Sequence, residues 1–313
     1  MPEQHPSVDS EKGAIPYHVP VMLQEAIDGL DIKPEGIYVD CTFGGGGHAR
    51  GILQRLTEKG KLIAFDQDED AGRNLPNDPR LIFVPHNFRH IGRFLKLYKA
   101  EKVDGILADL GVSSHQFDEA ERGFSTRFDA PLDMRMDPRQ PLTAAGVLQD
   151  LSEQELHKIF ERYGEVTNAK TLARTITEYR QSVPLKTIRQ FKDALQSVVK
   201  GNPNKYFAQV FQALRIVVND EFGSLEEMLE QAPSLLKPGG RISVITFHSL
   251  EDRIVKNFFR YGNMELPEAD EVYGTRVDNP LLVINKKPIL PSAEEINRNP
   301  RARSAKLRIA QRK

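Results

Sequence analysis

Acidic residues close three short apolar segments of the sequence. Asp40, Asp66 and Asp109 each follow a run of β-branched and aliphatic residues of strand length, and a run of four glycines, residues 44–47, comes soon after Asp40. Glycines let the backbone approach a ligand closely. Carboxylates can accept hydrogen bonds from ribose hydroxyls or pair with an ammonium group. These residue types at this spacing predict a site for an adenosine-containing ligand.

Two classes of adenosine cofactor are compatible with the glycine run. Gly44, Gly46 and Ala49 match a loose dinucleotide fingerprint, and Asp66 lies twenty residues beyond Gly46, as that fingerprint requires. An NAD(P)-dependent oxidoreductase is therefore one hypothesis. The glycine run alone does not decide between this hypothesis and a methyltransferase.

Three further residues favour S-adenosylmethionine as the cofactor. Asp40 is placed to hold the methionine ammonium, Phe88 to flank the adenine, and Asp109 ends a later strand, where methyltransferases carry a functional acid or amide. Alternatively, Phe88 is an aromatic residue of the core with no ligand contact. His48, likewise, is either a ligand contact or a solvated side chain at the start of a helix. No metal ligand set is predicted.

The strands that must position these residues alternate with amphipathic segments of helix length, which predicts a mostly parallel sheet with crossover helices. The fold class is therefore α/β and Rossmann-like. The strand candidates are Ile37–Cys41, Leu62–Asp66, Leu81–Val84, Val103–Asp109 and Ile242–Thr246.

The alternation breaks after Asp109, where about 130 residues pass without another convincing buried strand. Ser152 with Glu155, and Thr187 with Gln190, have the spacing of helix-capping boxes. We predict an all-helical insertion over residues 115–205. Residues 15–114 and 206–313 then form one discontinuous Rossmann-like domain, to which a helix beginning near residue 206 returns the chain.

The composition indicates which binding partners and which cellular compartment to expect. The net charge is -1, yet residues 286–313 hold nine Lys or Arg against two acids, which suits either a polyanion partner or a solvated terminus. The single cysteine, Cys41, and a start without a secretory pattern predict a cytoplasmic protein. No apolar run reaches the roughly 20 residues that span a bilayer, so no membrane partner is expected.

Several long blocks, in order along the chain, resemble the bacterial ribosomal small-subunit cytosine-N4 methyltransferase H family, also called MraW. They are His18-Val-Pro-Val-Met22, Asp40-Cys-Thr-Phe-Gly-Gly-Gly-Gly-His48, Asp109-Leu-Gly-Val-Ser-Ser-His-Gln116, Glu121-Arg-Gly-Phe-Ser125, Ala130-Pro-Leu-Asp-Met-Arg-Met-Asp137, Phe211-Gln-Ala-Leu-Arg215, Phe247-His-Ser-Leu-Glu-Asp-Arg253 and Asn299-Pro-Arg-Ala-Arg-Ser304. Two departures are Gly45, where relatives often carry arginine, and Asn204–Ala208, where they often show His-Pro-Ala-Thr-Arg. No RNA contact is assigned to the second stretch.

The resemblance implies a class I S-adenosylmethionine-dependent methyltransferase fold. It implies methylation of the N4 amine of a cytidine in the decoding centre of 16S rRNA, within the small ribosomal subunit. A homodimer is left open. The family's cofactor contacts fall on Gly46, Gly47, His48, Asp66, Phe88, Asp109 and Gln116.

Two roles are open for Asp109: hydrogen-bond acceptor for the target amine, or cofactor contact alone. His248 either contacts the target base or has only a structural role. Ser249 with Asp252 predicts a helix N-cap. The helical insertion and the basic C-terminal segment are the expected RNA-binding surfaces, through Arg122, Arg127, Arg135, Arg301, Arg303 and Arg308. Alternatively, Arg122 and Arg135 pair with Asp118, Asp133 or Asp137 within their loop. A non-catalytic RNA-binding assembly factor is the remaining hypothesis.

Overall fold

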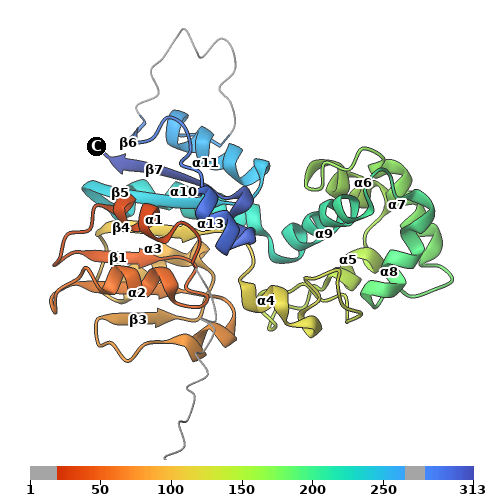
Figure 1. The fold of residues 1–313 in the computed structure, drawn as a ribbon, viewed down its shortest axis with the longest axis horizontal. Coiled ribbons are helices and arrows are strands. Elements are labelled where there is room, and N and C mark those ends of the chain that lie inside the picture. Colours follow the sequence, from red (N-terminus) through yellow and green to blue (C-terminus); the bar gives the residue numbers. More distant parts are fainter. Residues whose placement is uncertain (1–19, 265–278) are drawn as a thin grey trace, which may run out of the picture.

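A seven-stranded sheet in the order β3-β2-β1-β4-β5-β7-β6 forms the larger part of the computed structural model (Figure 1). The structure describes residues 20–264 and 279–313, so His18 and Val19 of the first family block lie outside it. Strands β1 to β5 run parallel, whereas β7 is antiparallel to both β5 and β6. The strands are β1 Ile37–Asp40, β2 Lys61–Phe65, β3 Leu81–Val84, β4 Val103–Asp109, β5 Leu236–Thr246, β6 Leu281–Val283 and β7 Lys306–Arg312.

Helices cover both faces of this sheet, which explains why its central strands bury apolar side chains on both faces. Neighbouring residues of β1 show the division: Tyr38 packs with α1 Leu23–Leu30 and α2 Gly47–Leu53, while Val39 faces the opposite layer. That layer contains α3 Ile91–Leu97, α10 Glu221–Leu235 and α11 Ser249–Tyr261. The predicted Rossmann-like class and all of its strand candidates are confirmed.

The basic C-terminal segment is part of the sheet, so the expectation of a solvated terminus is wrong for β7. Leu307 and Ile309 pack under α1 and α2, and Ala310 packs on the opposite face. Arg308 is buried because its guanidinium donates to both carboxylate oxygens of Asp252, at 2.6 and 3.0 Å. Alternating apolar side chains make this segment a strand, and its charges hide that pattern in the sequence.

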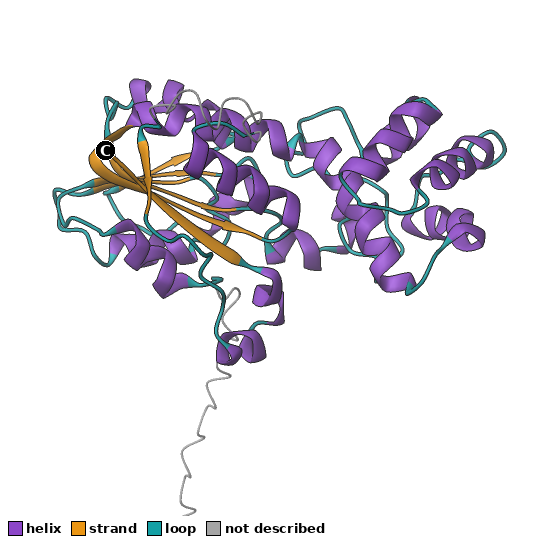
Figure 2. Ribbon diagram, turned by 90° about the horizontal axis from the view of Figure 1, so that it is seen from above, coloured by secondary structure: helices purple, strands orange, loops and turns teal. Residues whose placement is uncertain are grey.

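A second group of helices projects from the sheet and has its own apolar core (Figure 2). Ser152 with Glu155 and Thr187 with Gln190 form the predicted capping boxes, so the helical character of the segment is confirmed. No helix among the described residues is both long and apolar enough to cross a membrane. The helices are α4 Ser114–Asp118, α5 Ala144–Asp150, α6 Glu153–Arg162, α7 Ala169–Tyr179, α8 Ile188–Leu195 and α9 Pro203–Asn219, while α13 Ala293–Arg298 follows β6.

Helix α9 packs with the helical group. Its buried residues Val210, Leu214 and Val218 lie in the same cluster as Leu156 of α6 and Leu172 of α7. The buried face of α9 therefore packs on the helical group along the length of the helix. The amphipathic pattern of α9 shows that one face is buried but not which partner buries it.

Candidate active site

Asp40, Asp66 and Asp109 stand at one edge of the sheet. They lie at or just after the ends of β1, β2 and β4, which are neighbouring parallel strands. A cleft of about 1450 Å³, its open mouth included, lies at this edge. Open α/β sheets bind their ligands at this position. The cleft is therefore the candidate active site.

The glycine run forms one wall of the cleft. Gly44 has φ +49° and its amide donates to Asp66 Oδ2 at 2.7 Å. A Cβ at Gly44 would meet the Cβ of Ser113 at 3.8 Å, an ordinary van der Waals contact, so the positive φ rather than crowding favours glycine here. At Gly47 a Cβ would lie 2.8 Å from the Pro20 ring, so this glycine allows the segment before α1 to close over the loop. The run thus brings backbone to the cleft surface, as predicted.

Most of the predicted cofactor residues line the cleft. Two differ: Gly46 lies behind the wall at the start of α2, and Asp40 is fully buried beneath it. The expected contact between Asp40 and a methionine ammonium is therefore not direct. The residues of the prediction that do line the cleft are Gly47, His48, Asp66, Phe88, Asp109 and Gln116.

Asp109 has an incomplete set of hydrogen bonds. Its Oδ1 is buried and without a hydrogen-bond partner among the described residues. Its Oδ2 lies 3.7 Å from Nδ1 of His48, whose Nε2 donates to the Val21 carbonyl at 3.0 Å. Burial, reinforced by the charges of Asp40 and Glu251, raises the pKa of Asp109 well above its usual range. A carboxyl in this state can accept a proton more readily than an exposed one.

The other two acids share this environment. Burial raises the pKa of Asp40 to about 7 and that of Asp66 to about 6, although each accepts a backbone amide. The acids on the cleft wall, Asp66, Asp68, Asp109, Glu221 and Glu251, outnumber the basic side chains there, His48, His115 and Arg301. A cationic ligand would relieve the repulsion among these carboxyls.

S-adenosylmethionine fits this arrangement by charge. Its sulfonium and ammonium groups are both positive, and the cleft wall includes Asp66 and Phe88, the residues predicted to contact the ribose and the adenine. A dinucleotide would instead bring a doubly negative pyrophosphate toward the same acids. The acidic side chains of the cleft therefore favour S-adenosylmethionine over NAD(P) as the ligand.

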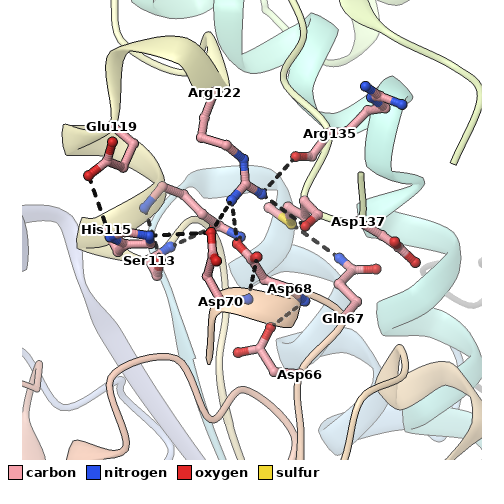
Figure 3. A network of polar contacts seen from close by, with 12 residues as sticks. Asp66, Gln67, Asp68, Asp70, Ser113, His115, Glu119, Arg122, Arg135 and Asp137 are labelled. Atoms are coloured by element: carbon pink, nitrogen blue, oxygen red, sulfur yellow. Dashed lines mark hydrogen bonds and ion pairs between the residues drawn. The ribbon is translucent and has the colours of Figure 1, made fainter. Parts of the chain in front are cut away.

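An ion-pair network holds the segment after β4 against the cleft (Figure 3). Arg122 lies 2.9 Å from Asp68 and donates to the carbonyls of Arg135 and Met136 at 3.1 and 3.0 Å. Gln116 completes a capping box with Ser113 and donates to Asp68 at 2.7 Å. Asp68 is thus a central residue of the site that the sequence did not indicate.

The predicted RNA-binding arginines divide into two groups. The guanidiniums of Arg122, Arg135 and Arg308 are engaged in ion pairs within the protein, with Asp68, Asp133 and Asp252. Arg135 pairs as the alternative predicted, whereas Arg122 pairs outside its own loop. The exposed members are Arg127, Arg301 and Arg303.

His248 and Glu251 lie beside the end of β5. The N-cap of α11 is His248, which accepts from the Glu251 amide at 3.4 Å, so the predicted N-cap at Ser249 is displaced by one residue. Glu251 is on the cleft wall, and its Oε1 lies 3.0 Å from His248 Nε2. Burial opposes ionisation of Glu251, but the bond to His248 and the charges of His248 and Arg215 outweigh it and lower its pKa. Glu251, rather than His248, presents the functional group to the cleft.

The raised pKa of Asp40 predicts a pH-dependent stability. The folded protein keeps a proton on Asp40 up to about pH 7, whereas an unfolded aspartate releases it near pH 4. Stability of the unliganded protein is therefore lost as pH rises through this window, by about 1.4 kcal/mol per pKa unit. Thermal unfolding should show Asp40→Asn gaining stability relative to wild type between pH 5 and pH 8. Parallel pH profiles, like those expected of the exposed control Glu35→Gln, would contradict the prediction.

The strand order and the acid-lined cleft at the carboxyl edge define a Rossmann-like class I methyltransferase fold. Residues 16–313 match the MraW methylase family, and the chain belongs to this family of S-adenosylmethionine-dependent methyltransferases.

Two similar proteins share one name. The chain is 52% identical over 304 residues to the ribosomal RNA small subunit methyltransferase H of Bacteroides thetaiotaomicron, covering 97% of this chain and 100% of the relative. It is 54% identical over 296 residues to the protein of that name from Flavobacterium johnsoniae, covering 94% and 97%. A solved rRNA methylase from Streptococcus thermophilus has a TM-score of 0.40 at 12% identity, covering 94% of this chain and 98% of that one. The fold assignment rests on the strand order.

Proposed function

We propose that this protein transfers a methyl group from S-adenosylmethionine to the N4 amine of a cytidine in 16S rRNA of the small ribosomal subunit. The observation that carries the proposal is Asp109 on the wall of the cleft, whose buried Oδ1 has no hydrogen-bond partner within residues 20–264 and 279–313. The substrate class is supported by the names of relatives 52% and 54% identical over nearly their whole length. The cytoplasm, where ribosomes are assembled, is the corresponding compartment.

The target nucleobase is proposed to lie beside the cofactor in the cleft, whose wall includes Leu110, Asn219 and Glu251 as well as the glycine loop and Phe88. The target base must be unstacked to enter it, which costs less in single-stranded RNA than in a duplex. The helical group, continuous with the cleft through α4 and α9, is the proposed RNA-recognition subdomain.

The cofactor would be held by the glycine loop, Asp66 and Phe88. When bound, it supplies a methyl group activated by a positively charged sulfur. The chain's own part is to exclude water with the walls of the cleft and to orient the amine. Correct placement of two reactants can contribute about 7–11 kcal/mol to lowering a barrier.

Asp109 is proposed to accept a hydrogen bond from the exocyclic amine. The lone pair of that nitrogen is delocalised into the cytosine ring, and an acceptor for its N–H group localises the pair on nitrogen. The C–N bond would form as the methyl carbon–sulfur bond breaks, leaving S-adenosylhomocysteine as the neutral thioether. The nitrogen would then lose a proton, which the Asp109 carboxylate could take. The raised pKa of Asp109 suits this acceptor role.

Methyl transfer to small subunits tests the proposal. Purified protein is incubated with radiolabelled-methyl S-adenosylmethionine and subunits from cells lacking the enzyme, and the nucleosides are then separated by mass spectrometry. We expect N4-methylcytidine at one site. Label on another nucleoside would overturn the assignment of the amine, and no label despite cofactor binding would support a non-catalytic assembly factor. Reduced-nicotinamide fluorescence on mixing would support the oxidoreductase.

A further inference from the structure

Two arginines and two phenylalanines are stacked beside the cleft. The guanidinium of Arg127 lies 5.6 Å from the ring centroid of Phe117 and 5.6 Å from that of Phe128. The guanidinium of Arg301 lies 5.5 Å from the same Phe117 ring. We call these four side chains the Arg-Phe stack. It joins residues from α4, from the loop after it and from the C-terminal segment.

The Arg-Phe stack is exposed where the cleft opens. The side chains of Arg127 and Arg301 are 59% and 42% exposed, and Phe128 is 42% exposed. Arg301 also lines the cleft itself, and Phe117 belongs to α4, which begins five residues after Asp109. A polymer whose target unit enters the cleft would therefore pass over these side chains.

The stack carries an excess of positive charge. Asp118 pairs with both arginines through the same oxygen, Oδ1, at 3.3 Å from Arg127 and 2.6 Å from Arg301. One carboxylate thus fixes two guanidiniums without neutralising them. Exposed single arginines are common on protein surfaces, and Arg260 over Tyr261 at 5.1 Å is such a pair elsewhere in this chain. Two arginines that share one ring and one carboxylate beside a cleft form a more ordered surface.

The geometry favours phosphate as the group recognised. A guanidinium that lies against a ring keeps its N–H donors at its edge, in the fork that matches a phosphate. Because Phe117 and Asp118 already restrict both arginines, less side-chain entropy is lost when a ligand binds. A nucleobase could lie on the exposed Phe128 ring, but the charged edges are the larger recognition element.

We infer that the Arg-Phe stack binds the phosphodiester backbone of the RNA next to the target nucleotide. The inference rests on the proposed function, since it assumes that an RNA enters the cleft. It predicts that Arg127 and Arg301 act on RNA affinity, while the chemistry at Asp109, which neither contacts in the described structure, is unchanged once RNA is bound.

Filter binding of 16S rRNA and of small subunits to the full chain at several salt concentrations tests the inference. Arg127→Ala and Arg301→Ala should each raise Kd about tenfold at low salt and reduce the slope of log K against log salt by about 1. Arg127→Lys and Arg301→Lys should keep the slope but recover only part of the affinity, because lysine lacks the planar fork. Turnover of Arg127→Ala at saturating subunits should stay close to that of the wild type, because Arg127 is not among the residues that line the cleft.

Arg260→Ala is the matched control. It removes the same charge and the same kind of ring contact at the far end of α11, about 14 Å along that helix from Glu251 on the cleft wall. Equal losses for Arg260→Ala and the stack variants, or unchanged Kd in both stack variants, would overturn the inference. If the wild type bound RNA without methylating it, the proposed function would be contradicted instead. The Kd values of the stack variants relative to the wild type would still test whether the Arg-Phe stack binds RNA.

Discussion

Replacing Asp109 with asparagine should lower kcat for methyl transfer to small subunits by at least about 100-fold, the lower range for loss of a general base. Asparagine has nearly the same shape, so the fold and the cleft should persist. Its amide oxygen can accept a hydrogen bond but cannot take the proton that the amine loses. Cofactor affinity, measured by calorimetry, should change little if the carboxylate acts mainly on the acceptor base.

The pH profile of the same variant gives a second test. Because burial raises the pKa of Asp109, part of the wild-type enzyme holds a protonated, inactive Asp109 above the ordinary carboxyl range. The wild-type rate should therefore rise with pH as this group loses its proton. Asp109→Asn should lack that rise.

Asp104→Asn is the matched control, since it makes the same change at the other end of β4. Asp104 pairs with Lys33 and Lys237, away from the cleft, so its loss should affect stability more than kcat. If Asp109→Asn retained kcat while cofactor affinity fell, Asp109 would be a cofactor contact only. That outcome would leave the acceptor role to another carboxyl, and Glu251 is the one on the cleft wall with a lowered pKa.

The sequence predicted those parts of the site that depend on local signals. An acid at the end of a buried strand is visible in the sequence, and parallel strands must bring such ends to one edge. Asp66 and Asp109 therefore came together on the wall of the cleft as expected, and the Gly44 amide donates to Asp66. The capping boxes of the helical group were predictable for the same reason, because each involves residues three apart.

The parts that sequence reasoning missed depend on contacts between distant segments. Asp68 pairs with Arg122 fifty-four residues later, and Arg308 pairs with Asp252 fifty-six residues earlier. Nothing local distinguishes these arginines from Arg301, which remains exposed. The capping box of Ser113 and Gln116 had a local signal, yet Gln116 was considered only as a ligand contact. It serves the helix and Asp68 as well.

The largest expected effect on stability belongs to Arg122. Its guanidinium joins Asp68, after β2, to the carbonyls of Arg135 and Met136, and only 17% of its side chain is exposed (Figure 3). Arg122→Ala would leave the buried Asp68 with Gln116 as its side-chain partner. Removing one partner of a buried ion pair typically costs about 3–5 kcal/mol. We expect a loss of that size in urea unfolding.

Two further variants separate the ion pair from the rest of the side chain. Asp68→Asn in the Arg122→Ala background should recover part of the loss, because the uncompensated charge is gone. Arg139→Ala is the control in the same segment. The Arg139 side chain, which pairs with Asp137, is 44% exposed, so loss of this ion pair should cost less than about 1 kcal/mol. If Arg122→Ala cost no more than Arg139→Ala, the segment would be held by its apolar contacts. In that case the Asp68 network would serve to orient Gln116 toward the cleft, and cofactor affinity would fall without a loss of stability.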